Sequence, residues 1–215
     1  MTTSRPATGG NVYDKYRTRH PVERRLVEGF VNQLAGLVAR TGATEVHEVG
    51  CGEGELLLRL AARGVWPPNA SLRGSDVSTE VIEEARRRAG AFGVGIRFKA
   101  ASIHDLDPVE DSAELVLCCE VLEHLDDPAA AVEVVAGLAR PWLVVSVPKE
   151  PLWRVLNLAR LKYVNELGNT PGHRQHWSRR SFLDFLGDRV EVVAVRHPLP
   201  WTMVLCRSTH RMLAP

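Results

Sequence analysis

HEVGCGEGELLLRLAARG, residues 47–64, places three glycines between a short β-rich run and a run with apolar residues at helical spacing. This pattern predicts a strand, a tight turn and a helix. The glycines let the backbone turn sharply and approach a ligand; they are Gly50, Gly52 and Gly54. A phosphate loop would need GxxxxGK followed by Ser or Thr, and a dinucleotide fingerprint would need glycine where Glu55 stands. The turn therefore indicates a different kind of ligand.

The alternation of strand and helix continues along the chain. Strands are expected at residues 45–49, 72–76, 96–101, 114–119 and 142–147, with helices at 53–62, 79–89 and 128–139. A leading helix is expected over 13–40, broken near Pro21 and stopped by Gly42. This order predicts an α/β fold with a doubly wound, mostly parallel sheet and helices on both faces. Ligands of such sheets bind beyond the carboxyl ends of the strands.

The last third of the chain has a different pattern. Residues 149–180 are irregular, with helical pieces at 152–165 and 178–186. Two β-rich runs, 190–196 and 203–206, are joined by HPLPW and predict an antiparallel hairpin at the edge of the sheet. We therefore expect one domain, divided into a tail (1–12), a helical lid (13–43), a cofactor-binding core (44–148), a substrate or lid insertion (149–187) and edge strands (188–215).

Composition bounds the function. The 215 residues are 45% apolar and 25% charged, which suits a globular core and excludes a disordered chain. The formal charge of +1 argues against a protein whose overall positive charge attracts nucleic acid or a membrane surface. The four cysteines form no CxxC pair, which excludes a disulfide framework or a cysteine zinc site. Without a secretory or membrane-spanning stretch, the expected location is the cytoplasm, with no membrane insertion.

Asp76 ends the expected second strand, in RGSDVS. An acid at this place in α/β nucleoside-binding proteins accepts hydrogen bonds from both hydroxyls of a ribose. The alternative is a turn or N-cap acid, because Asp76 and Ser78 both precede a helix. The glycine turn nearby favours the ribose interpretation.

Four ordered motifs now identify a family. EVGCGEG, SDVS, the segment AASIHDLDPVEDSAELVLCCEVLEHLDDP and WLVVSVP follow one another within residues 44–148. Together they resemble class I methyltransferases, which use S-adenosylmethionine. The resemblance implies a Rossmann-like sheet of seven strands.

The resemblance also implies a role for individual residues. Glu48 and the glycine turn, with Cys51, would lie along the methionine part of the cofactor, and Asp76 would hold the ribose. The adenine would contact Val77, Ser102 and Ile103, although Ser102 stands where the family often has an acid, so a backbone carbonyl or Asp105 is the alternative contact. Cys119 and Glu120 would border the sulfonium.

The candidate catalytic residues lie in CEVLEHLDD and are Glu120, Glu123 and His124, with His173 from GNTPGHRQHWS. A hydroxyl acceptor needs its proton removed, for which His124 is the candidate base. The alternative to a catalytic role is that Glu123 and His124 only cap or stabilise this turn. The spacing EVLEH also resembles ubiquinone-pathway O-methyltransferases and small-RNA terminal 2′-O-methyltransferases, in which two glutamates and the histidine can hold a divalent ion.

By that resemblance the metal ligands would be Glu120, Glu123 and His124, with His173 or His176 as a fourth, and the ion would be Mg or Mn. The two later histidines stand three residues apart before Ser178, a helix cap, which predicts both imidazoles at one helix entrance.

Two segments are basic despite the overall neutrality. Residues 149–180 carry seven basic residues against two acidic ones, and residues 1–25 carry six against two. They predict either a lid over an anionic substrate or a solvated surface. Trp153, Tyr163 and Trp177 are candidates for an aromatic-binding pocket, with a core position favoured for Trp177.

Three functions remain open on this evidence. The first is methylation of a small molecule, on oxygen, with an anionic or aromatic acceptor. The second is a metal-assisted RNA 2′-O-methyltransferase, against which stand the neutral charge and the lack of a basic stripe with interleaved aromatics. The third is a cofactor-binding protein without catalysis.

Overall fold

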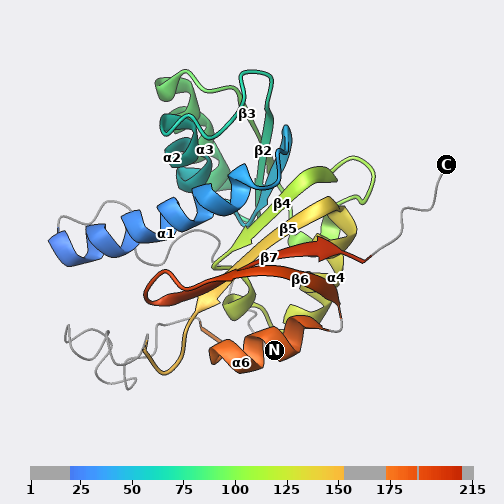
Figure 1. Ribbon diagram of the computed structural model, residues 1–215. Coiled ribbons are helices and arrows are strands. Elements are labelled where there is room, and N and C mark those ends of the chain that lie inside the picture. The colour runs from blue at the N-terminus through green and yellow to red at the C-terminus, as the bar shows by residue number, and fades with distance from the viewer. Residues whose placement is uncertain (1–19, 153–172, 188, 210–215) are drawn as a thin grey trace, which may run out of the picture.

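The computed structural model describes residues 20–152, 173–187 and 189–209, and its centre is a sheet of seven strands in the order β3-β2-β1-β4-β5-β7-β6 (Figure 1). The strands are β1 Glu45–Val49, β2 Ser71–Asp76, β3 Ile96–Ala100, β4 Ala113–Cys119, β5 Ala139–Pro148, β6 Val190–Arg196 and β7 Trp201–Ser208. The helices are α1 Pro21–Ala39, α2 Glu55–Ala62, α3 Thr79–Phe92, α4 Pro128–Leu138 and α6 Arg179–Gly187, with short 3-10 turns η1 Ile103–Asp105 and η2 Leu122–His124.

Strands β1 to β5 are parallel, and β7 runs antiparallel to both β5 and β6. The predicted α/β fold, its mostly parallel sheet and its antiparallel hairpin are confirmed. The hairpin enters the sheet with its second strand inward, so that β7 lies between β5 and β6 and only β6 forms the edge. Residues 201–206 of β7 are accordingly all buried, whereas most of β6 is partly or fully exposed.

The sheet divides the apolar core in two. Leu115 and Leu117 of β4 pack with α1, α2 and α3, whereas Val116 and Cys118 pack with α4 and α6. Successive side chains of a strand point to opposite faces, and both faces of this strand are covered, so β4 reads as one apolar run. Helices on both faces were predicted and are confirmed.

Element boundaries depart from the prediction at several places, of which the start of α1 and the start of β5 are the most informative. Pro21 occupies the first turn of α1 and starts the helix, because the fixed φ of proline suits that position and its missing N–H is not needed there. Strand β5 begins at Ala139, directly after α4, where the sequence indicated helix to 139 and strand from 142. Ala139 pairs with Ala113, and the register then shifts before Leu115 pairs with Trp142. The predicted helix at 152–165 lies almost entirely outside the described residues.

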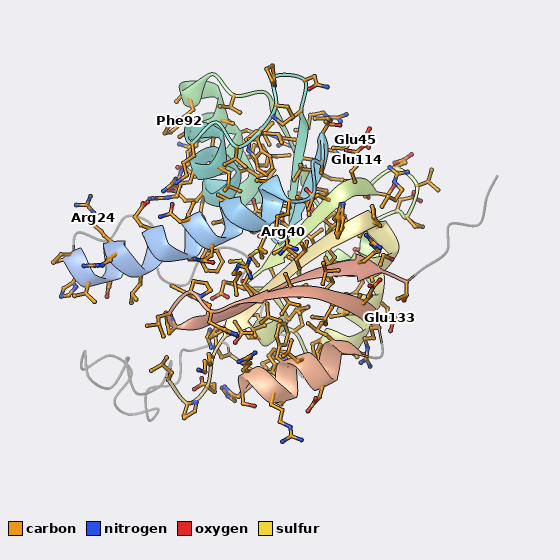
Figure 2. All side chains as sticks on the ribbon, in the orientation of Figure 1. Arg24, Arg40, Glu45, Phe92, Glu114 and Glu133 are labelled. Carbon is orange, nitrogen blue, oxygen red and sulfur yellow. The ribbon has the colours of Figure 1, made fainter. Side chains whose placement is uncertain are left out.

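At the amino edge of the sheet, where the parallel strands begin, a carboxylate binds the backbone at the start of β1. Glu114 at the start of β4 accepts hydrogen bonds from the backbone N–H groups of Thr44 and Glu45, at 2.6 and 3.2 Å (Figure 2). These backbone hydrogen bonds lower the pKa of Glu114. Glu114 therefore has a structural role at the amino edge of the sheet.

None of the helices in the described ranges is long and apolar enough to cross a membrane. The cytoplasmic location stays a prediction.

His47 joins three elements inside the sheet. Its Nδ1 lies 2.7 Å from the carbonyl oxygen of Asp111, and its Nε2 lies 2.9 Å from the hydroxyl of Ser75. A carbonyl can only accept, so Nδ1 carries the proton and Nε2 accepts from Ser75. Burial lowers the pKa of His47, and the Asp111 hydrogen bond opposes this only in part.

We expect the free energy of unfolding to fall as the pH drops from 7.5 to 5.5. In the unfolded chain His47 has an ordinary pKa of about 6.5 and takes up a proton in this pH range. In the folded protein its pKa is lower, so it takes up less of a proton there. The free energy of unfolding should therefore decrease by at most about 1.4 kcal/mol per pH unit from this residue. Urea denaturation at both pH values measures the difference. His47→Gln should reduce it, and His104→Gln, at an exposed site, should not. An unchanged difference in His47→Gln would contradict this assignment.

Candidate functional site at the carboxyl edge of the sheet

The glycine turn after β1 is bound to the end of β2. The backbone N–H groups of Gly50 and Cys51 both donate to the carbonyl oxygen of Ser75, at 2.7 and 2.9 Å. Gly50 has φ +72°, and a Cβ placed on it would lie 2.3 Å from a methyl carbon of Val121. Glycine is therefore needed at position 50 for backbone conformation and for space at once.

Asp76 connects the second strand to this turn. Its Oδ2 accepts from the N–H of Gly52 at 3.0 Å, and its Oδ1 accepts from the N–H of Ser78 at 3.1 Å. Ser78 is the N-cap of α3, because its hydroxyl accepts from the N–H of Val81. Asp76 thus acts as a turn acid, yet a carboxylate has about four acceptor positions, and two remain for a ligand. Val77 beside it is 47% exposed, so its side chain is accessible at this edge of the sheet.

The third strand ends next to Asp76. The N–H of Ala101 donates to the carbonyl oxygen of Asp76, which brings the predicted adenine contacts to the same edge. The Ser102 hydroxyl accepts from the N–H of His104 and caps η1, whereas Ile103 is buried. Asp105, the alternative contact, is exposed. The structure brings these residues together, and their adenine role stays a prediction.

Buried acids surround neutral thiols at this edge. Glu48 is almost fully buried, as are Cys51 and Cys119. Burial raises the pKa of both thiols well above the ordinary range, and the Glu48 carboxylate raises it further. A thiol with a raised pKa is a poor nucleophile, which makes Cys51 and Cys119 poor candidates for covalent chemistry.

Glu120 follows β4 in a left-handed conformation, with φ +62°. Its N–H donates to the carbonyl oxygen of Ser146 at 3.0 Å, and its Oε1 accepts from the Ser146 hydroxyl at 3.1 Å. Its Oε2 accepts from the indole N–H of Trp201. The predicted sulfonium neighbour is therefore held by strands β5 and β7.

A cluster of possible metal ligands lies next to Glu120 along the chain. One ligand atom each from Glu123, His124 and His173 lies within 4.8 Å of the others, in the part of the chain that the structure describes. The two imidazole rings meet edge to face, with centroids 4.9 Å apart. Glu123 is 1% exposed. Of the five predicted ligands, Glu120 and His176 are not members of this cluster.

The segment 173–177 has no helix or regular strand and lies against the turn that carries Glu123. The N–H groups of Arg174 and Gln175 both donate to the carbonyl oxygen of Glu123, at 2.7 and 3.1 Å. His176 turns away, with Nδ1 3.6 Å from a carboxylate oxygen of Glu150. Helix α6 begins only at Arg179, so the two histidines precede the helix in a segment without regular secondary structure, and they have different neighbours. This corrects the expectation of both imidazoles at one helix entrance.

The basic and aromatic residues of segment 149–180 lie only partly within the described residues. Of the basic residues in 149–180, Arg174 forms an ion pair with Asp126, and Lys149, Arg179 and Arg180 are also in the described ranges. Trp177 is buried and packs on Phe182 and Phe185, in the core as favoured. The other predicted basic and aromatic residues of this segment, Arg154, Arg160, Lys162, Trp153 and Tyr163, lie outside the described residues.

Two residues of the site were missed by sequence reasoning. Trp201 was assigned to the hairpin link, and only the inward position of β7 brings its indole to Glu120. Gly74 lies in β2, where a Cβ would come within 2.9 Å of the Cys51 sulfur and 3.0 Å of the Phe98 ring. A glycine inside a strand was the available signal for such a close approach.

The sequence of residues 46–141 matches the model of a family described as a methyltransferase domain. The ubiquinone biosynthesis O-methyltransferase of Neisseria meningitidis serogroup A is 37% identical over 129 residues, 59% of this chain and 50% of the relative. That of Cupriavidus pinatubonensis is 32% identical over 114 residues, 53% of this chain and 42% of the relative. The chain thus spans about half the length of these curated relatives.

Solved structures resemble the whole fold. Magnesium protoporphyrin IX methyltransferase from Synechocystis, with bound S-adenosylhomocysteine, aligns over 91% of this chain and 94% of its own, with a TM-score of 0.64 and 22% identity. A small RNA methyltransferase aligns over 88% of this chain and 26% of its own, with a TM-score of 0.68 and 21% identity. At these identities the likeness is one of fold.

We expect Gly50→Ala to destabilise the protein more than Gly93→Ala. Both glycines have φ near +70°, so both variants bear the strain of a left-handed alanine, about 1 kcal/mol. Only at position 50 does the new methyl collide, because nothing lies within 4 Å of a Cβ at Gly93. Overpacking should add about 1–3 kcal/mol, measured by urea denaturation. Equal losses in the two variants would show that Val121 does not restrict the turn.

Proposed function

We propose that this chain, which belongs with the class I methyltransferases by its fold and by the methyltransferase domain at residues 46–141, transfers the methyl group of S-adenosylmethionine to an oxygen of a small molecule. The predicted resemblance to that family is confirmed. The acceptor class and the atom methylated are proposals, supported by the names of the curated relatives.

One contact carries the cofactor proposal, the hydrogen bond from Gly52 in the turn to the Asp76 carboxylate. It holds the acid and the glycine turn at one place on the carboxyl edge, with acceptor positions left for the ribose hydroxyls and the exposed Val77 beside them for adenine. Glu48 and Glu120 add negative charge along the methionine part. When bound, the cofactor supplies an activated methyl group, and the protein supplies alignment and electrostatics.

A hydroxyl acceptor also needs a route for its proton. His124 is exposed at the carboxyl edge, and its ring contacts that of His173. We infer that one of these imidazoles takes the proton, because neutral imidazole is a suitable base near neutral pH. Glu123 positions the pair, since its backbone carbonyl accepts the two N–H groups that follow His173.

The residues also fit a divalent ion as an additional component. A buried carboxylate and two imidazoles converge, and this mixed oxygen and nitrogen donor set suits Mn better than a structural zinc site. Glu123, His124 and His173 would hold the ion, which would polarise an acceptor oxygen. Glu120 and His176 have other neighbours in this structure and are not part of the proposed ligand set.

Methylation of RNA is the second candidate. The same cluster and the fold likeness to a small RNA methyltransferase favour it. Against it, the total charge is +1, and the Arg174 guanidinium is neutralised by Asp126. RNA binding that weakens steeply between 50 and about 200 mM salt would support this candidate over a small molecule.

Calorimetric titration with S-adenosylmethionine tests the cofactor site. We expect binding by the unmodified chain and at least about tenfold weaker binding by Asp76→Asn, which loses the charge that strengthens hydrogen bonds to the ribose. Asp184→Asn, an exposed acid on α6, is the matched control and should bind normally. Failure of the unmodified chain to bind would refute the proposed function.

Turnover needs a separate test, because binding alone also fits a non-catalytic protein. Incubation with labelled S-adenosylmethionine and metabolite extract, followed by mass spectrometry, should show a product heavier by one CH₂ unit.

Mn²⁺ added after chelation should raise the melting temperature, because an ion that binds only the folded state at about 100 times its Kd contributes about 2.7 kcal/mol. His173→Ala and His124→Ala should abolish the increase. His176→Ala should retain it, because His176 faces Glu150 instead. No increase in the unmodified chain would exclude the metal, and loss of it in His176→Ala would contradict the ligand set.

A further inference from the structure

Glu120 is the one non-glycine residue with a positive φ in the described ranges. A left-handed conformation at a residue with a side chain is unfavourable and persists only where the surroundings enforce it. Such residues cluster at ligand sites. The contacts that enforce this conformation at Glu120 are therefore of functional interest.

Within the described residues, each oxygen of the Glu120 carboxylate accepts a hydrogen bond from a side chain. Ser146 of β5 donates its hydroxyl to Oε1, and Trp201 of β7 donates its indole N–H to Oε2. Both donors are almost fully buried. A carboxylate that already accepts two such bonds has a fixed orientation, and it is better suited to attract a positive charge than to remove a proton.

Trp201 is itself held in place. Its ring meets that of Phe30 from α1 edge to face, with centroids 5.1 Å apart, and its backbone pairs with Pro148 at the end of β5. Because β7 is antiparallel, its first residue lies at the same edge as the last residues of β4 and β5. Helix α1 and the hairpin thus both support one carboxylate in the site.

Glu120 also lies beside the glycine turn. The next residue, Val121, is the one whose methyl fills the space over Gly50, and the preceding residue, Cys119, has a pKa raised by burial and by the Glu48 and Glu120 carboxylates. Glu120 is therefore one residue away from the contact with the turn proposed for the methionine part of the cofactor, and its carboxylate is bound by β5 and β7. That part of the cofactor carries an ammonium and a sulfonium, and only the sulfonium loses its charge on methyl transfer.

We propose that Trp201 is a positioning residue that holds the Glu120 carboxylate toward the sulfonium of S-adenosylmethionine. This inference rests on the proposed function. After methyl transfer the sulfur is a neutral thioether, so the attraction disappears. The site should therefore bind S-adenosylmethionine more tightly than S-adenosylhomocysteine, and this preference should depend on Trp201.

Calorimetry with both compounds tests the proposal on the full chain. Trp201→Phe keeps the ring against Phe30 and loses the N–H. In this variant the Kd of S-adenosylhomocysteine divided by the Kd of S-adenosylmethionine should fall about tenfold, which corresponds to the loss of one charge-assisted hydrogen bond. Glu120→Gln should lower the ratio similarly. The double variant should show no further fall, because Trp201 acts through Glu120. Trp66→Phe, which loses an indole hydrogen bond to Leu57 elsewhere, is the control and should keep the ratio.

Three outcomes separate the possibilities. Equal weakening of both compounds in Trp201→Phe, or a further fall of the ratio in the double variant, would reduce Trp201 to a packing residue and overturn the proposal. If Trp201→Phe does not fold, Ser146→Ala removes the other donor and should lower the same ratio, and an unchanged ratio would overturn it. No binding of either compound by the unmodified chain would refute the proposed function itself.

Discussion

The carbonyl oxygen of Ser75 makes the interaction on which the rest of the site depends. It accepts the N–H groups of both Gly50 and Cys51, and the Ser75 hydroxyl donates to His47 in the neighbouring strand. The last residues of β2 therefore fix both the glycine turn and the register of β1. Once the turn is held there, its Gly52 N–H reaches Asp76, and Gly50 has no room for a side chain.

Electrostatics follow from this geometry. The strand ends bring Glu48, Asp76 and Glu120 to one edge, and burial together with these carboxylates keeps the thiols of Cys51 and Cys119 protonated. A negative edge with neutral thiols fits a positively charged ligand and disfavours a covalent intermediate on cysteine. At the opposite edge, Glu114 accepts backbone N–H groups of Thr44 and Glu45, which is a structural role.

The segment after β5 adds the second half of the site. Residues 173–177 lie against the turn after β4 through two hydrogen bonds to the Glu123 carbonyl oxygen and the ion pair of Arg174 with Asp126. This contact places His173 against His124 and sends His176 to Glu150. Two histidines that look equivalent in the sequence thus have different neighbours, because the residues between them are hydrogen-bonded to the Glu123 carbonyl oxygen and form no helix.

The parallel sheet, the glycine turn and Asp76 at the end of its strand could be predicted from the sequence alone, because apolar periodicity and glycine spacing are local properties. The sequence also offered the residues of EVLEH as candidates for acid–base chemistry or for stabilising a turn, and their role stays a prediction. Only the tertiary structure decided that His173 and not His176 joins His124, and that Trp201 reaches Glu120. These two residues are separated by 81 positions, and they meet because β7 enters the sheet antiparallel beside β5, a pairing that local patterns do not encode.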